Sequence, residues 1–107
     1  MNTAWMALFV AGLAEIGWPI GLKISQSPGQ TWPGIILSLI SFAVSGGLLW
    51  FAQKEIPIGT AYAVWTGIGA AGTFLVGVLF YHDSMHFTRF MAIGFIITGV
   101  VLLKAGH

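Results

Sequence analysis

The chain has 107 residues, enough for one domain, of which 57 % are hydrophobic and 7 % are charged. Soluble domains carry about 25 % charged residues, so most of this surface must face lipid, and the net charge of +1 lacks the basic excess that nucleic acids require. The absence of cysteine excludes disulfides, thiol nucleophiles and thiolate metal sites.

Four apolar runs are suited to cross a bilayer, whose hydrocarbon core takes about 20 helical residues. They cover residues 4–22, 31–52, 56–81 and 88–104. The fourth run is short, and it spans the bilayer if the side chains of Arg89 and Lys104 extend to the two interfaces. Brief linkers make neighbouring helices antiparallel. The sequence therefore predicts an all-α membrane protein with a single domain of four short transmembrane helices over residues 1–107.

The basic residues are divided evenly between the two sides of the predicted bundle. Lys54 and Lys104 lie on the side of the N-terminus, and Lys23 and Arg89 lie on the other. The positive-inside rule therefore gives almost no orientation. Two interpretations stay open: four charges are too few to be informative, or the chain inserts in both orientations and pairs as an antiparallel dimer.

Small residues recur along the third run in two stripes at four-residue spacing. The stripes are Ala63, Gly67 and Ala71, and Gly69, Thr73 and Gly77. Such stripes let helices approach closely, and four thin helices make a poor pathway alone, so we expect at least a dimer. Gly67 and Gly69 also weaken the helix locally. They suit either a conformational hinge for alternating access or packing alone, and the spacing favours neither.

Glu15 is the one charged residue inside the first run. An ionised carboxylate in hydrocarbon costs several kcal/mol, so Glu15 must face a cavity, face a partner or hold a proton. A proton and a cation both neutralise the charge, and the two compete for one site, which is the physical basis of proton/cation antiport. The alternative is a structural glutamic acid, kept neutral and hydrogen-bonded between helices.

Groups suited to bind a small planar cation accompany Glu15. Gly12 and Trp18 share a helical face with it at three-residue spacing. Gly12 leaves space, and Trp18 offers an indole N–H or a ring face. The second and third runs add a hydroxyl and aromatic rings: Ser45, Tyr62 and Trp65. We predict that these residues line a site around Glu15.

His82 and His86 have the i, i+4 spacing of a metal pair, with Asp83 between them. They lie in a linker beside the membrane with no third soft ligand near, so we expect no metal site. The sequence also contains no arrangement of nucleophile and base and no phosphate-binding loop. We therefore expect a protein that is not an enzyme and needs no cofactor.

Over essentially its whole length the chain resembles the small multidrug resistance family. The motifs that carry the resemblance are GLAEIGW at 12–18, GLK at 21–23 and PIGTAYAVWTGIG at 57–69. Within the family the chain is most similar to the guanidinium exporter subfamily. Trp18 stands three residues after the glutamate, where exporters of polyaromatic cations usually have a small residue. Thr60 and Lys104 point the same way.

The resemblance implies an antiparallel homodimer with dual topology, a multi-pass protein of the bacterial plasma (inner) membrane. It implies export of guanidinium or substituted guanidinium cations in exchange for protons, with Glu15 of both subunits binding proton and substrate competitively. It also implies that Trp18, Ser45, Tyr62 and Trp65 line or brace that site. The alternatives are a quaternary-ammonium multidrug exporter, one half of a heterodimer with a paralogue, and a structural membrane subunit that transports nothing.

Three residues depart from the family's pattern. Pro19 lacks an N–H and clashes with the preceding turn, so it predicts a kink near Glu15. Gly46 and Gly47 stand where bulkier residues are usual. We hypothesise that these glycines open the site sideways toward lipid, which would admit guanidines with an alkyl tail.

Overall fold

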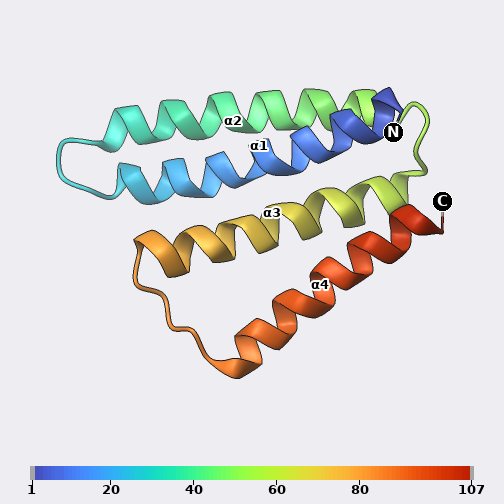
Figure 1. The fold of residues 1–107 in the computed structure, drawn as a ribbon. Coiled ribbons are helices and arrows are strands. Elements are labelled where there is room, and N and C mark those ends of the chain that lie inside the picture. Colours follow the sequence, from blue (N-terminus) through green and yellow to red (C-terminus); the bar gives the residue numbers. More distant parts are fainter. Residues whose placement is uncertain (1, 107) are drawn as a thin grey trace.

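The computed structural model describes residues 2–106 as four helices (Figure 1). In chain order they are α1 (Thr3–Ser25), α2 (Thr31–Ala52), α3 (Ile58–Phe80) and α4 (Phe87–Ala105). All four are long and apolar enough to cross a membrane, and no strand occurs within the described part. The predicted all-α fold with four spans is confirmed. Met1 and His107, which the predicted domain includes, lie outside the described residues.

Local chemistry explains where two of the helices begin. Asn2 is the N-cap of α1, and its side-chain oxygen accepts a hydrogen bond of 2.9 Å from the backbone N–H of Trp5. α3 begins at Ile58, two residues later than the predicted run, since its N-cap Pro57 has a non-helical ψ of 142°. α1 continues through Pro19 to Ser25, because a single proline does not end a helix whose other backbone groups can pair only within it in a bilayer.

The helices form an open arrangement in which α1 is central. α1 packs along α2 and α3, whereas α4 packs mainly against α3 and reaches α1 through Lys104, whose ammonium lies 5.0 Å from the centre of the Trp5 ring (Figure 1). α4 diverges from α3 toward the loop that joins them, and none of the residues of α4 is buried. One chain therefore leaves a whole span to be covered by lipid or by another protein.

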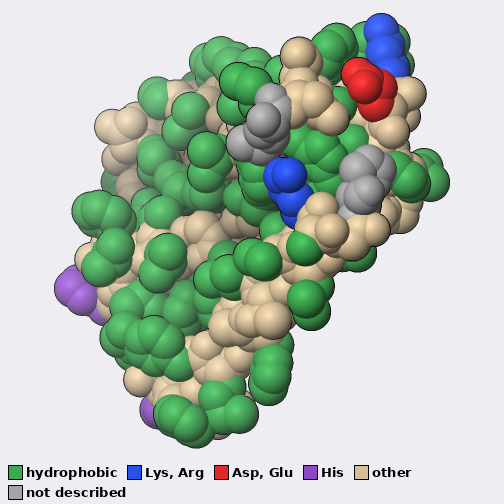
Figure 2. Space-filling model, turned by 45° about the vertical axis from the view of Figure 1, so that its right-hand side comes forward, with side chains coloured by type: hydrophobic (Ala, Val, Ile, Leu, Met, Phe, Trp, Pro, Cys, Tyr) green, Lys and Arg blue, Asp and Glu red, His purple; other side chains and the backbone are tan. Residues whose placement is uncertain are grey.

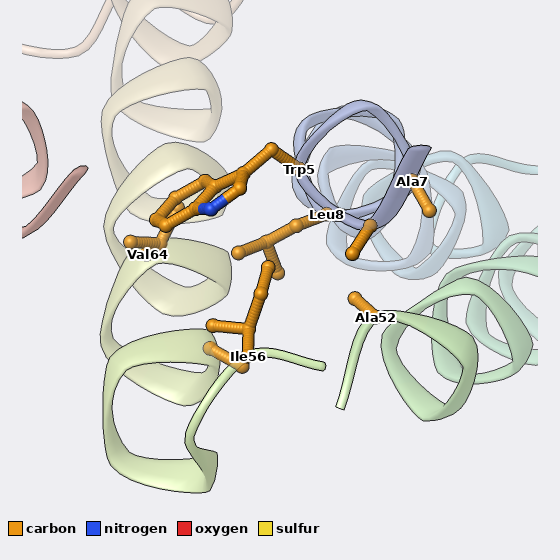
Figure 3. Packing of buried hydrophobic residues seen from close by; sticks show 8 residues of the cluster. Trp5, Ala7, Leu8, Ala52, Ile56 and Val64 are labelled. Atoms are coloured by element: carbon orange, nitrogen blue, oxygen red, sulfur yellow. The ribbon is translucent and has the colours of Figure 1, made fainter. Parts of the chain in front are cut away.

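The hydrophobic core lies at the N-terminal end of α1. Trp5 and Leu8 of α1 point toward α3, where Val64 meets them (Figure 3). Ile56, in the linker before α3, packs into the same cluster, and so does Ala52 at the C-terminal end of α2. Leu8, Val64 and Ile56 are almost completely buried. This cluster joins three helices at the end of the bundle that holds the N-terminus.

Glycine lets α1 and α2 approach each other at the opposite end. A Cβ atom at Gly21 would lie 2.7 Å from the carbonyl oxygen of Gly34, and one at Gly34 would overlap the backbone of α1. The hydroxyl of Ser38 donates a 2.7 Å hydrogen bond to the carbonyl of Trp18 across this seam. The two helices are thus fixed by backbone contact and by a polar bond that crosses between them.

The outer surface has the composition of a lipid-facing protein. Hydrophobic side chains cover much of the face in Figure 2, with basic and acidic side chains toward one end and histidine at the opposite edge. Large apolar side chains are exposed along the middle of the helices, such as Leu39 at 64 % and Phe95 at 70 %. This distribution matches a bundle whose spans lie in hydrocarbon and whose linkers lie in the two interfaces.

Replacing Gly21 by alanine tests the seam between α1 and α2. The added methyl meets backbone that cannot yield, so we expect a loss of about 1–3 kcal/mol in the free energy of unfolding. The measurement is unfolding of micelle-bound protein by sodium dodecyl sulfate, followed by circular dichroism. Gly59→Ala is the matched control, because no neighbouring atom among residues 2–106 lies within 4 Å of its added Cβ. Equal destabilisation by both changes would contradict the seam.

Candidate functional site

Glu15 lies midway along α1, half-buried, with its carboxylate directed at α3. One carboxylate oxygen rests against Gly69, where an added Cβ atom would overlap it. The other oxygen accepts a 3.2 Å hydrogen bond from the indole Nε1–H of Trp18. Of the two roles that the sequence left open for Trp18, the N–H bond to Glu15 is the one present here. Gly69, for which the sequence left open a hinge or packing, provides the surface on which the carboxylate lies.

The Trp18 side chain is held between α1 and α2. Its ring meets Phe42 of α2 edge-on, with ring centroids 6.0 Å apart and planes at 79°. Edge-to-face packing of this kind stabilises aromatic pairs by about 0.5–1.5 kcal/mol. The indole N–H therefore reaches Glu15 from a ring that the second helix holds in place.

A second polar group, the hydroxyl of Ser45 on α2, contacts α1 at Ala11, one helical turn before Glu15. The hydroxyl of Ser45 is fully buried and donates a 2.6 Å hydrogen bond to the carbonyl of Ala11. The same hydroxyl accepts a 2.8 Å hydrogen bond from the indole Nε1–H of Trp65. The ring of Tyr62 packs on Trp65 at 5.5 Å and is 57 % exposed. The structure thus brings Ser45, Trp65 and Tyr62 together, and Ala11 links them to the turn that carries Glu15.

The remaining predicted site residues are glycines at helix contacts. The space beside Gly12 is filled by Ile68 of α3, so in this chain its missing side chain admits a neighbouring helix. Gly67 packs against Val100 of α4, and α3 is continuous through Gly67 and Gly69. These contacts account for both glycines of the predicted hinge by packing, and their role as a hinge stays a prediction.

Two serines of this site were not anticipated from the sequence. Ser38 bonds to the carbonyl of Trp18, and the hydroxyl of Ser41 occupies the space beside Gly17. Together with Ser45 they have i, i+3, i+7 spacing, which places three hydroxyls on one face of α2. That spacing is the signal that could have revealed them.

The linker histidines do not assemble a metal site in the described chain. Across residues 2–106, no three His, Cys, Asp or Glu side chains are close enough to hold a metal ion together. His82 instead takes a left-handed backbone conformation with φ of 59° at the end of α3. Its place in the sequence is therefore explained by the turn that follows this helix.

The fold and the site define a small multi-pass membrane protein with one carboxylate inside its helices. Residues 3–96 match the model of a family described as "Small Multidrug Resistance protein", and the chain belongs to this family. The family is one of transporters, which implies that the chain is not an enzyme. Four spans and relatives from bacteria make the chain a multi-pass protein of the bacterial inner membrane.

The most informative relatives carry a substrate in their names. The chain is 46 % identical over 101 residues to the guanidinium exporter of Yersinia pseudotuberculosis serotype I (strain IP32953), covering 94 % of this chain and 96 % of the relative. It is 43 % identical to the guanidinium exporter of Proteus vulgaris, over 94 % and 96 % of the two chains. It is 40 % identical to the guanidinium exporter of Salmonella typhimurium (strain LT2), over 94 % and 95 %.

Two variants test the two polar groups of the site against each other. Gly69→Ala displaces the Glu15 carboxylate, so the indole N–H resonance of Trp18 should shift in an NMR spectrum. Ser45→Ala removes the acceptor of Trp65, so the Trp65 indole resonance should shift and stability should fall by about 0.6–1.7 kcal/mol. Each variant is the control for the other. If both variants perturbed both indoles equally, the two groups would not be the separate units that the structure describes.

Proposed function

We propose that this chain exports guanidinium or substituted guanidinium cations in exchange for protons. The observation that carries the proposal is the position of the Glu15 carboxylate, which lies within a membrane span with one indole N–H bound to it. A charged carboxylate in hydrocarbon needs a counterion or a proton. The substrate class is supported by the three relatives that are named guanidinium exporters.

Guanidinium fits the groups around Glu15 chemically. Its planar N–H donors pair with both oxygens of a carboxylate, and its faces stack on aromatic rings. Trp18 offers a ring beside the carboxylate, and Trp65 lies one turn further along the site. Binding the cation displaces the proton, because the two neutralise the same charge. Cation export is coupled to proton import if the protein that holds neither a proton nor a cation reorients only slowly between the two sides of the membrane.

We further propose that two chains form this site as an antiparallel homodimer with dual topology. Two observations support a second chain: α4 has no buried residue, and Tyr62 is exposed beside the site. The even division of Lys23, Lys54, Arg89 and Lys104 between the two sides permits both orientations. In such a dimer, Glu15 of each subunit contributes to one central site, and like charges oppose simultaneous ionisation of both.

Alternating access, in which the site opens first to one side of the membrane and then to the other, requires α3 to change its contacts. Gly67 and Gly69 lie at its centre, and we propose that they allow the bend that exposes Glu15 to one side and then to the other. In the described conformation Gly69 lies against the carboxylate. A bend at this point would therefore move the helix surface that contacts the binding group.

Replacing Glu15 by glutamine tests the central role of the carboxylate. The amide is close to the same size but cannot exchange a proton for a cation, so guanidinium-driven proton flux should fall at least about 100-fold. The flux is measured with a pH-sensitive dye inside proteoliposomes that contain the purified protein. Glu55→Gln is the matched control, since Glu55 is exposed in the linker between α2 and α3. Coupled transport retained by Glu15→Gln would refute the mechanism.

The same assay separates the alternatives. A quaternary-ammonium exporter would move tetraalkylammonium ions in preference to guanidinium. A chain that functions only beside a paralogue would be silent when purified alone and active when the two are reconstituted together. A structural subunit would move no cation, and its Glu15→Gln variant would behave as the parent chain does.

The glycines of α2 give a prediction about substituted guanidines. Among residues 2–106 no neighbouring atom lies within 4 Å of a Cβ added at Gly46 or Gly47, and Gly47 is exposed two residues beyond the buried Ser45. We propose that alkyl tails leave the site here, where each buried methylene stabilises binding by about 0.8 kcal/mol. Gly47→Leu should therefore raise the KM for butylguanidinium relative to that for guanidinium by about fivefold or more. An unchanged ratio of the two KM values would end this proposal.

A further inference from the structure

A cavity of about 250 Å³ lies between the C-terminal halves of α1 and α3. The lining residues that matter here are Pro19, Lys23, Thr73, Gly77, Tyr81 and Asp83. Pro19 follows Glu15 by one helical turn on α1, and Thr73 follows Gly69 by one turn on α3. The cavity therefore begins about 6 Å along the helices from the contact between Glu15 and Gly69.

The turn after α3 fixes the position of Asp83 in the lining of this cavity. His82 takes the left-handed conformation, which reverses the chain. The carbonyl of Gly77 then accepts hydrogen bonds from the backbone N–H of Tyr81 at 3.0 Å and from that of Asp83 at 3.1 Å. One carboxylate oxygen of Asp83 lies against Gly77, where an added Cβ atom would overlap it. Asp83 is thus held by backbone geometry and not left on a free loop.

Glu15 and Asp83 therefore rest on glycines of the same stripe of α3. Gly69 lies beneath the first carboxylate and Gly77 beneath the second. The two glycines are eight residues apart, which corresponds to about 12 Å along the helix, and Thr73 stands between them. Thr73 and Gly77 of this stripe line the cavity together with Asp83, and the contact between Glu15 and Gly69 lies one helical turn beyond Thr73.

The neighbouring cations leave the Asp83 carboxylate available. The ammonium of Lys23 lies 5.9 Å from the centre of the Tyr81 ring. Arg89 donates a 3.0 Å hydrogen bond to the hydroxyl of Ser84, and its guanidinium lies 5.0 Å from the centre of the Phe74 ring. In the part of the chain that the structure describes, neither cation forms an ion pair with Asp83.

We infer that Asp83 is a second cation-binding carboxylate, at which guanidinium binds before it reaches Glu15 and after it leaves. The inference rests on the proposed function and adds an outer site to it. The carboxylate accepts two N–H donors of the cation, and the hydroxyl of Thr73 accepts a third as the cation moves along the stripe. Asp83 also offsets the repulsion that Lys23, which lines the same cavity from α1, exerts on an entering cation.

The test is guanidinium-driven proton flux in proteoliposomes of phosphatidylethanolamine and phosphatidylcholine, which carry no net charge. At an ionic strength of about 0.01 M, where charges act over about 30 Å, Asp83→Asn should raise the KM for guanidinium at least about threefold with kcat unchanged. Asp83→Glu should restore most of the affinity. At about 1 M salt, where charges act over about 3 Å, the difference between the parent and Asp83→Asn should disappear.

The controls separate this inference from the function on which it rests. Glu55→Gln removes a carboxylate from the opposite end of the bundle and should leave KM unchanged. If Glu15→Gln abolishes flux while Asp83→Asn keeps the parent's KM at low salt, the outer site is refuted and the exporter proposal stands. A fall in kcat that Asp83→Glu does not restore also refutes it, since that indicates a structural role. If the parent chain moves no guanidinium, both proposals fail.

Should Asp83→Asn not fold, Asp83→Ser and the parent chain keep the inference testable. The KM of the parent should itself rise at least about threefold between low and high salt, because an outer carboxylate attracts the cation only while its charge is unscreened. A KM that does not depend on salt would overturn the outer site without any variant.

Discussion

The contact of the Glu15 carboxylate with the backbone of Gly69 is the constraint on which this structure depends. Hydrocarbon offers no water to a carboxylate, so the protein must supply its surroundings. A side chain at Gly69 would occupy the space that the carboxylate takes, and Gly72 likewise admits the end of Ile16. α1 and α3 can therefore approach closely enough to enclose a carboxyl group only because α3 carries glycine at these positions.

The polar bonds of the spans divide the chain into a firmly joined part and a loosely joined part. The hydroxyls of Ser38 and Ser45 donate to carbonyls of α1, and such bonds hold membrane helices in a fixed register. The side chains of α4 contact its neighbours through cation–π pairs, from Arg89 to Phe74 of α3 and from Lys104 to Trp5 of α1, while the hydroxyl of Thr98 donates to Gly94 in its own helix. The proposed change of facing would therefore meet least resistance at α4 and at the surface of α3 that it covers.

Sequence reasoning succeeded where one helix or one apolar run decides the outcome. The four spans follow from the length of the apolar runs, and the bond between Glu15 and Trp18 follows from their spacing on α1. The bond from Trp65 to Ser45 depends on the register of α3 against α2, which no local pattern determines. The sequence could not distinguish two roles for Gly69. Glycine is suited both to a flexible point in a helix and to close contact with another helix, and only the register of α3 against α1 distinguishes them.

The sequence pattern around Asp83 pointed to a different role from the one that the structure suggests. Its position between two histidines raised the matter of a metal, whereas the structure places its carboxylate on Gly77, two turns beyond the glycine beneath Glu15. In the proposed antiparallel dimer, this arrangement would put one outer carboxylate on each side of the membrane and both inner carboxylates near the centre. A chain whose two orientations are equivalent needs such an entrance at both faces. In that dimer, the proposed outer site would need one acidic residue per chain, Asp83, beside the end of α3.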